Sequence, residues 1–142
     1  MGYFGNEEFT KNTPNLFKNV SLGILVYAIN DINSFNDIEN WYNILRTCQL
    51  NYPIFLIGNK CDLENERKIS KEEGEKKKND YGDNIKVFLE ISTKTGLNIK
   101  DLINQIALTL YKEMENNEKL KEGRITLQRE NFEKKKNKKR GC

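Results

Sequence analysis

Three short apolar runs stand out in the sequence, and each is continuous rather than alternating with polar residues. They span residues 24–29, 54–57 and 87–91. Continuous apolar strands are typical of a parallel sheet that helices cover on both faces. The pattern therefore predicts three parallel strands, each buried on both faces.

The segment after the first run has helical periodicity. Its apolar residues Ile38, Trp41 and Leu45 recur every three or four positions, which places them on one face of a helix. Ser34, followed three residues later by Asp37, is a capping signal ahead of them. We therefore expect a helix that starts near Ser34 and buries Trp41 in the core.

A second helix is predicted after the second apolar run. Ser70 and Glu73 have the spacing of a capping box, and the segment that they open continues to Tyr81. No large apolar residue lies between Ile69 and Tyr81, so this helix has little surface to bury. We expect it to be held by its cap and by charge pairs such as Glu73 with Lys77.

The clearest amphipathic pattern follows the third run and predicts a third helix, which starts near Asn98. Beyond Met114 the apolar positions are scattered among Glu, Asn and Lys, so we expect the helix to fray into a flexible tail. The chain accordingly divides into a domain, residues 1–117, and a flexible basic tail, residues 118–142. The apolar positions of the third helix are Ile99, Leu102, Ile103, Ile106 and Leu110.

The order of these elements predicts the fold class. Strands alternate with helices along the chain, and parallel strands joined through helices use right-handed crossovers. We therefore predict an α/β fold in which helices pack on a doubly wound, mostly parallel sheet.

The distribution of charge narrows the possible partners. The net charge is +3, but residues 134–140 carry six cations and no acid, so the remainder of the chain is slightly acidic. We therefore do not expect the domain itself to bind nucleic acid. A nucleic-acid-binding protein with a basic tail is an alternative function, which only the tail supports.

The three cysteines argue against two kinds of chemistry. Cys48, Cys61 and Cys142 lack the spacing of metal ligands, and the chain contains no histidine, so neither zinc binding nor Cys–His catalysis is expected. An odd number of widely spaced cysteines without a signal peptide favours a reducing, cytosolic setting.

Two polar clusters follow the second and third strands, where ligands bind in doubly wound sheets. The clusters are Asn59, Lys60 and Asp62 after the second strand and Ser92, Thr93 and Lys94 after the third. Together they offer the donors and acceptors of a guanine pocket. Taken alone, each cluster also fits a polar turn that closes a strand–helix loop.

The chemistry of guanine gives a role to these side chains. The Asp62 carboxylate can accept hydrogen bonds from the N1–H and the exocyclic amine of guanine, a pair that adenine cannot supply. The backbone N–H of Thr93 can donate to O6, and the stems of Lys60 and Lys94 can cover the two ring faces. Asn59 can join the two loops through its amide. Such a site rejects the wrong base by ~10⁴ or more, because a mismatch leaves buried polar groups unpaired.

The same residues resemble the guanine-specificity motifs of Ras-superfamily GTPases. One motif is Asn59-Lys60-Cys61-Asp62 after an apolar strand, and the other is Glu-Ile-Ser-Thr-Lys-Thr-Gly at residues 90–96. The resemblance covers residues 5–114 in the order and spacing of the family. It implies a domain that binds GTP or GDP and that, in the family, hydrolyses GTP with the help of Mg²⁺.

Several further stretches are similar to the Rab branch of this superfamily. They are residues 24–27, Ser34-Phe35, Trp41 and residues 58–63. The resemblance implies a regulator of intracellular vesicle traffic, with Rab-type effectors and regulatory proteins as partners. The alternative is a non-catalytic Rab-like interaction module, or an incomplete gene model, with little nucleotide binding of its own.

The start of the chain resembles the second switch region of the family. The catalytic glutamine of the family falls on Asn6, which has the same amide on a shorter arm, and the aspartate that helps hold Mg²⁺ falls on Gly2. No Gly-x-x-x-x-Gly-Lys-[Ser/Thr] loop is found in the chain. We therefore expect a partial domain without the first strands and the phosphate-binding loop, and only weak nucleotide binding.

The C-terminal residues resemble the membrane tail of the family. Cys142 is the last residue, and prenylated cysteines occupy this place in family members, whose tails usually end in two cysteines. The basic run at residues 134–140 supplies the second signal that stable membrane attachment needs. The resemblance implies lipidation of Cys142 and a location on the cytosolic face of intracellular membranes. The alternative is a solvated extension or a nuclear signal.

Overall fold

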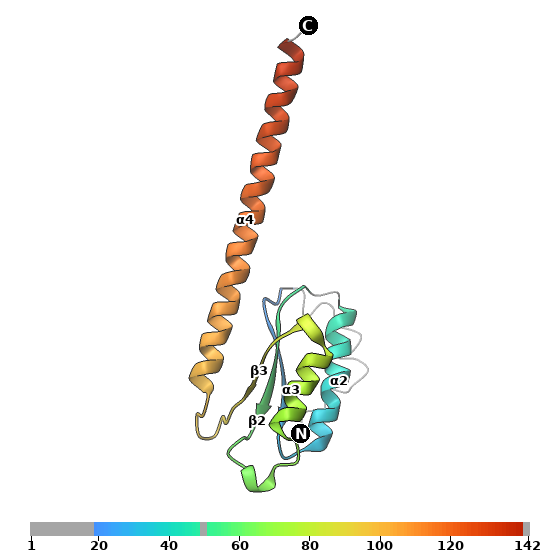
Figure 1. Cartoon of the computed structure of the whole chain (residues 1–142), viewed down its shortest axis with the longest axis vertical. Coiled ribbons are helices and arrows are strands. Elements are labelled where there is room, and N and C mark those ends of the chain that lie inside the picture. The colour runs from blue at the N-terminus through green and yellow to red at the C-terminus, as the bar shows by residue number, and fades with distance from the viewer. Residues whose placement is uncertain (1–18, 49–50, 141–142) are drawn as a thin grey trace. The chain divides into compact units, whose positions relative to one another are not determined.

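The computed structural model describes residues 19–48 and 51–140 of the chain (Figure 1). The chain separates into two units, Met1–Ile106 and Ala107–Cys142. The first unit holds the sheet, and the second holds most of the last helix. The elements are β1 (Gly23–Ala28), α2 (Ile32–Thr47), β2 (Ile54–Asn59), α3 (Lys71–Asp80), β3 (Ile85–Glu90) and α4 (Ile99–Arg140), with short 3₁₀ turns η1 (Glu64–Glu66) and η2 (Gly82–Asn84).

The three strands form one parallel sheet in the order β1-β2-β3. Leu56 of β2 pairs with Leu25 of β1 and with Phe88 of β3, and one register shift occurs between Ile54 and Phe55. The predicted α/β fold with a parallel sheet is confirmed. Because all three strands run in the same direction, the loops that follow them lie at one edge of the sheet.

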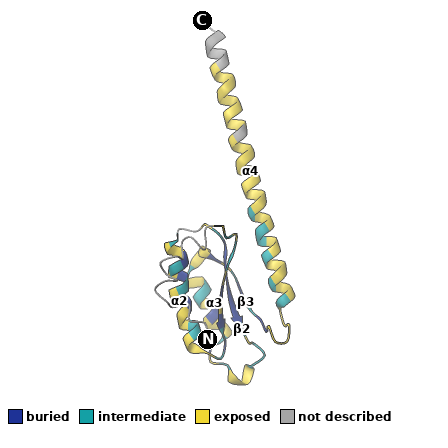
Figure 2. Ribbon diagram, turned by 180° about the vertical axis from the view of Figure 1, so that it is seen from behind, coloured by how far each residue is buried: buried dark blue, intermediate teal, exposed yellow. Residues whose placement is uncertain are grey.

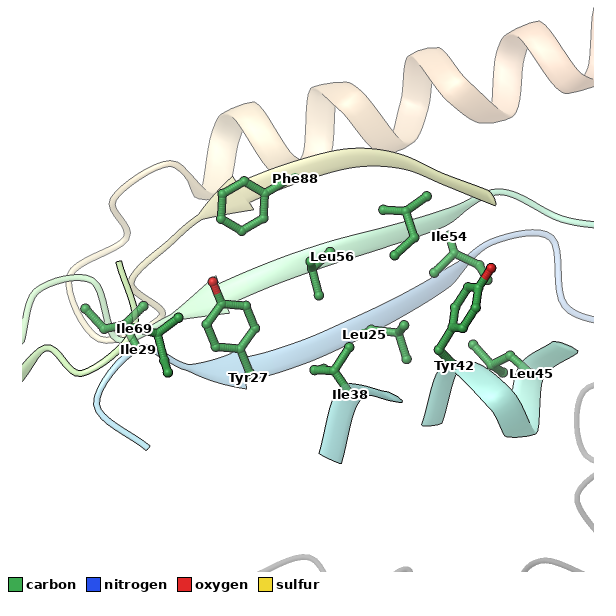
Figure 3. Packing of buried hydrophobic residues seen from close by; sticks show 11 residues of the cluster. Leu25, Tyr27, Ile29, Ile38, Tyr42, Leu45, Ile54, Leu56, Ile69 and Phe88 are labelled. Carbon is green, nitrogen blue, oxygen red and sulfur yellow. The ribbon is translucent and has the colours of Figure 1, made fainter. Parts of the chain in front are cut away.

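The first face of the sheet packs on α2. Figure 3 shows Leu25, Tyr27 and Leu56 on the side of the sheet that contacts Ile38 and other residues of this helix. β2 lies at the centre, and its residues Phe55, Leu56 and Ile57 are fully buried, which confirms the expectation for this strand. The buried strands and the exposed outer surfaces of the helices are visible in Figure 2.

The second face is covered only in part. Phe55 and Ile57 of β2 pack with Ile91 and with the first turns of α4, through Ile99, Leu102 and Ile106. Ile24 and Val26 of β1 lie on the same face but are 42% and 52% exposed. The prediction that β1 is buried on both faces is therefore wrong. In the described part of the chain β1 is an edge strand, and no described helix covers this part of it.

Helix α2 begins earlier than the sequence pattern predicted. Its N-cap is Asp31, whose Oδ1 accepts hydrogen bonds from the backbone N–H groups of Asn33 and Ser34 at 3.0 and 3.3 Å. Ser34 is therefore not the cap. Its hydroxyl accepts from the backbone N–H of Ala28 at 3.0 Å and donates to the carbonyl of Asp31 at 2.7 Å. Ser34 thus fixes the helix start to the end of β1.

Helix α3 confirms its predicted cap but not its predicted charge pair. The Ser70 hydroxyl accepts from the Glu73 N–H at 3.1 Å, and the Glu73 carboxylate accepts from the Ser70 N–H at 2.7 Å. Glu73 therefore does not pair with Lys77, whose Nζ lies 4.3 Å from the centre of the Phe35 ring instead. The only buried residue of α3 is Gly74, which lets the helix backbone approach the sheet closely.

Helix α4 is longer than expected, since it continues through residue 140 instead of fraying near Met114. The expected flexible tail is therefore helical over residues 118–140. This segment contains no proline and is rich in Lys, Arg and Glu, all of which favour helix. Among the described residues, no helix combines the length and the apolar character that crossing a bilayer requires.

Candidate functional site

A pocket of about 200 Å³ lies at the carboxyl ends of β2 and β3. Its lining consists of Asn59, Lys60, Asp62, Leu63, Thr93 and Lys94. Five of the six residues predicted to recognise a base therefore line one cavity. The sixth, Ser92, is fully buried behind it. Leu63 was not predicted, although it directly follows Asp62, and it adds an apolar side chain to the lining.

Asn59 joins the two loops, as predicted. Its amide oxygen accepts a hydrogen bond from the backbone N–H of Thr93 at 3.2 Å, and its amide nitrogen donates to the Thr93 hydroxyl at 3.3 Å. The backbone N–H of Thr93, the proposed donor to guanine O6, therefore already has an acceptor. A base oxygen would have to share this donor or displace the Asn59 amide.

Asp62 is held in place by Ser92. The Ser92 hydroxyl donates to Asp62 Oδ1 at 2.7 Å and accepts from the backbone N–H of Thr95 at 3.1 Å. Because a carboxylate can only accept, the Thr95 contact and the Asp62 contact together fix the direction of the hydroxyl proton. Among the described residues, Asp62 Oδ2 makes no hydrogen bond. One oxygen thus orients the carboxylate, and the other can accept from a ligand.

Lys60 takes an uncommon backbone conformation in the pocket wall. Its φ is 64°, in the left-handed region, and its carbonyl accepts from the N–H of Leu63 at 2.9 Å. Next to it, the N–H of Cys61 donates to the carbonyl of Ile91 at 3.1 Å, which joins the loop to the end of β3. Burial raises the pKa of the Cys61 thiol, so the residue behaves as a neutral packing group.

An ion pair that the sequence pattern did not reveal lies beside the two loops. Arg67 Nη1 and Nη2 donate to the two carboxylate oxygens of Glu90 at 2.7 and 2.9 Å. Arg67 Nε also donates to Glu64 at 2.9 Å. The hydrogen bonds to Glu90 and to Glu64 both raise the pKa of Arg67 above its ordinary value, and the bond to Glu90 has the larger effect. The available signal was Glu90 itself, because a carboxylate inside an apolar strand requires a partner.

The other predicted residues cannot be placed. Asn6 and Cys142, proposed for catalysis and lipidation, lie outside the described residues, as does Gly2. In residues 19–48 and 51–140 no group of three or more acidic, cysteine or histidine side chains could hold a metal ion. The described part of the chain therefore offers no ligand set from which a role for Mg²⁺ can be derived.

A comparison with family models agrees with this geometry. Residues 4–112 match the model of the Ras family. The matched region contains all three strands, both loops of the pocket and the first turns of α4.

Proposed function

The chain belongs to the Ras family of small GTPases, and on that premise we propose that it is a Rab-type member that binds guanine nucleotides and acts in vesicle traffic. Membership of the Ras family supports a GTP-binding domain. The Rab identity rests on residues within β1, at the end of β2 and in the segments that follow these strands. Ser34 is one of these, and its hydrogen bond to Ala28 gives that motif a structural role.

The single observation that carries guanine recognition is the orientation of Asp62. Ser92 holds Oδ1 at 2.7 Å, which leaves Oδ2 to accept from the ligand. Guanine presents two adjacent donors, N1–H and the exocyclic amine, to a carboxylate. Adenine has an acceptor at N1, so it would place a lone pair against a negative charge. The pocket therefore favours guanine because the wrong base leaves the carboxylate unpaired.

The size of the pocket indicates how much of a nucleotide it can hold. Its volume of about 200 Å³ is below the ~300–1,000 Å³ of most ligand pockets, so it suits one base rather than a whole nucleotide. Without phosphate contacts we expect millimolar binding, about −4 kcal/mol. Tight nucleotide binding and GTP hydrolysis would require the phosphate-binding groups that the family has and for which this sequence has no matching motif.

The proposed location follows from the same family reading. Prenylation of Cys142 and attraction of the basic run at residues 134–140 to anionic lipid would together hold the protein on the cytosolic face of intracellular membranes. Rab-type effectors and regulators would then be its protein partners.

A base-competition experiment tests the central proposal. The 142-residue chain is titrated with GMP, AMP and XMP at millimolar concentration while the backbone amides of residues 59–63 and 92–95 are followed by NMR. Wild type should prefer GMP. Asp62→Asn should prefer XMP, because the exocyclic oxygen of xanthine accepts where the amine of guanine donates.

A matched control is available in η2. Asp83→Asn removes an exposed carboxylate that precedes β3 at its amino end and does not line the pocket, so it should leave the GMP preference unchanged. Equal affinity of wild type for GMP and AMP would contradict the proposal and would favour the non-catalytic interaction module.

A further inference from the structure

We propose that the Arg67–Glu90 ion pair is the positioning element that sets base selectivity, by holding the two pocket loops at a fixed separation. This inference rests on the proposed function of the pocket. Neither residue lines the cavity. Both are joined through the chain to residues that do, since Glu90 ends β3 just before Ser92 and Arg67 follows Asp62 through η1.

Glu90 is fixed on both its side chain and its backbone. Arg67 binds both carboxylate oxygens, and the carbonyl of Glu90 accepts from the Asn98 amide at 2.8 Å. The next residue, Ile91, donates its N–H to the carbonyl of Gly58 at 2.8 Å. Glu90 is therefore held through both its side chain and its backbone directly before the segment that carries Ser92 and Thr93.

Arg67 is anchored to the core at its other end. Its Nη1 also donates to the carbonyl of Ile69 at 2.8 Å, and the N–H of Ile69 donates to the carbonyl of Ile29 at 2.9 Å. Ile29 and Ile69 are both buried, as Figure 3 shows for their side chains. Arg67 therefore couples the segment after Asp62 to β1 and, through Glu90, to β3.

The geometry requires an arginine. The Arg67 and Glu90 side chains are only 19% and 11% exposed, so solvent screens the pair weakly. A planar guanidinium binds a carboxylate through two parallel hydrogen bonds, whereas an ammonium cannot. Arg67→Lys thus keeps the charge and releases the orientation of Glu90. The separation of Asp62 from Thr93 would then vary, and a base could no longer contact both at once.

The test compares variants that break the pair with one that does not. Arg67→Lys and Glu90→Gln break the bidentate contact. Glu64→Gln removes the charge of the second carboxylate that binds Arg67 and leaves Glu90 in place. The Glu64 side chain is 68% exposed. The ratio of GMP to AMP affinity is measured by NMR titration. It should fall about tenfold in the first two variants and stay within about twofold of wild type in Glu64→Gln.

Two further measurements separate positioning from simple stability. Amide exchange should speed up at residues 60–62 and 92–95 in Arg67→Lys, while exchange in β2 stays unchanged. The double reversal Arg67→Glu with Glu90→Arg should recover part of the GMP preference. If the pair were purely structural, breaking it would lower the midpoint temperature of thermal unfolding but leave the ratio of GMP to AMP affinity unchanged.

The possible outcomes separate a failure of the positioning role from a failure of guanine recognition. If wild type shows no GMP preference, both fail. If wild type prefers GMP and Arg67→Lys and Glu90→Gln retain that ratio, the positioning role alone is overturned. It is also overturned if both single variants lose cooperative unfolding and the double reversal refolds without regaining the preference.

Discussion

The hydroxyl of Ser92 lies 2.7 Å from Asp62 Oδ1 and donates to it across 30 positions of sequence. This contact connects the loop after β2 with the loop after β3 behind the pocket, where Ser92 is fully buried. It orients the carboxylate before any ligand arrives. Ligand binding then needs less ordering of the site, which favours affinity.

Replacing Ser92 with alanine should therefore weaken both the fold and the pocket. The change leaves Asp62 Oδ1 and the Thr95 N–H without their partner, at a cost of about 1–3 kcal/mol in the free energy of unfolding. We also expect GMP affinity to fall about fivefold to tenfold, since about 1–1.4 kcal/mol corresponds to that change. Urea unfolding and NMR titration measure the two effects.

Ser70→Ala is the control for stability. It removes the N-cap of α3 and should cost about 1 kcal/mol without touching the pocket. Equal loss of GMP binding in Ser92→Ala and Ser70→Ala would mean that the Ser92 effect is only global destabilisation.

Replacing Gly74 with alanine should destabilise the protein even though alanine favours helix. A Cβ at this position would lie 2.3 Å from Phe88 Cζ and 2.7 Å from the Tyr27 hydroxyl. Both rings are buried and cannot move aside freely, so we expect a net loss of about 1–3 kcal/mol in the free energy of unfolding. Urea unfolding followed by circular dichroism gives the value.

Gly123 in α4 provides the opposite case. Nothing lies within 4 Å of a Cβ built there, so Gly123→Ala should raise helicity by removing a cost of about 1 kcal/mol. A stabilising Gly74→Ala change would show that α3 can move away from the sheet.

Among the described residues no strand pairs with the outer edge of β1, and this edge should make the chain prone to self-association. Ile24 and Val26 are exposed there, and an apolar cavity of about 720 Å³ lies along the strand, lined in part by Leu22 and Trp41. In the family the strand of the phosphate loop lies next to this strand. We expect self-association and poor solubility at high protein concentration, and Val26→Lys should reduce aggregation because charge on an edge strand opposes pairing.

Sedimentation, near-UV circular dichroism and thermal unfolding test this expectation. Leu25→Lys is the contrasting change, because Leu25 faces the core and a buried lysine should abolish folding. A wild type that stays monomeric and soluble at high protein concentration would contradict the prediction.

The C-terminal segment should bind membranes through two additive signals. Cys142→Ser should leave weak binding to anionic vesicles that salt removes, since the Debye length falls from ~10 Å at 0.1 M to ~3 Å at 1 M salt. Neutralising residues 134–140 should instead leave weak binding that is independent of lipid charge. Vesicle co-sedimentation measures both, and mass spectrometry of protein from eukaryotic cells reports the isoprenoid.

Neutralising Lys76 and Lys78 of α3 is the control for charge in general and should not change the salt dependence. If Cys142 carries no isoprenoid and the combined tail change leaves membrane partition unaltered, the segment is only a solvated extension.

The strands and the pocket were predictable because their signals are local. The apolar run of β2 is buried throughout, and the polar clusters directly after β2 and β3 meet because parallel strands end at one edge of the sheet. The prediction for β1 was wrong, since the same run of apolar residues also fits a strand buried on one face at an edge. Strand order is a property of the whole sheet, and a single run does not encode it.

Competition between nearby groups explains the other errors. Asp31 and Ser34 can each cap a helix, and the structure uses Asp31 because Ser34 bonds to Ala28. Glu73 had two possible partners, and the Ser70 N–H is the one that it binds. Arg67 and Glu90 are 23 positions apart, so no periodic pattern connects them. A charge inside an apolar strand predicts that a partner exists but not which residue it is.

The backbone of Lys60 places stability and binding in opposition at one position. At φ 64°, a lysine costs roughly 1–2 kcal/mol that a glycine would not. The lysine side chain supplies a wall of the pocket, which glycine lacks. A library of variants selected for thermal stability alone should therefore enrich glycine at position 60, whereas a library selected for base binding should retain lysine.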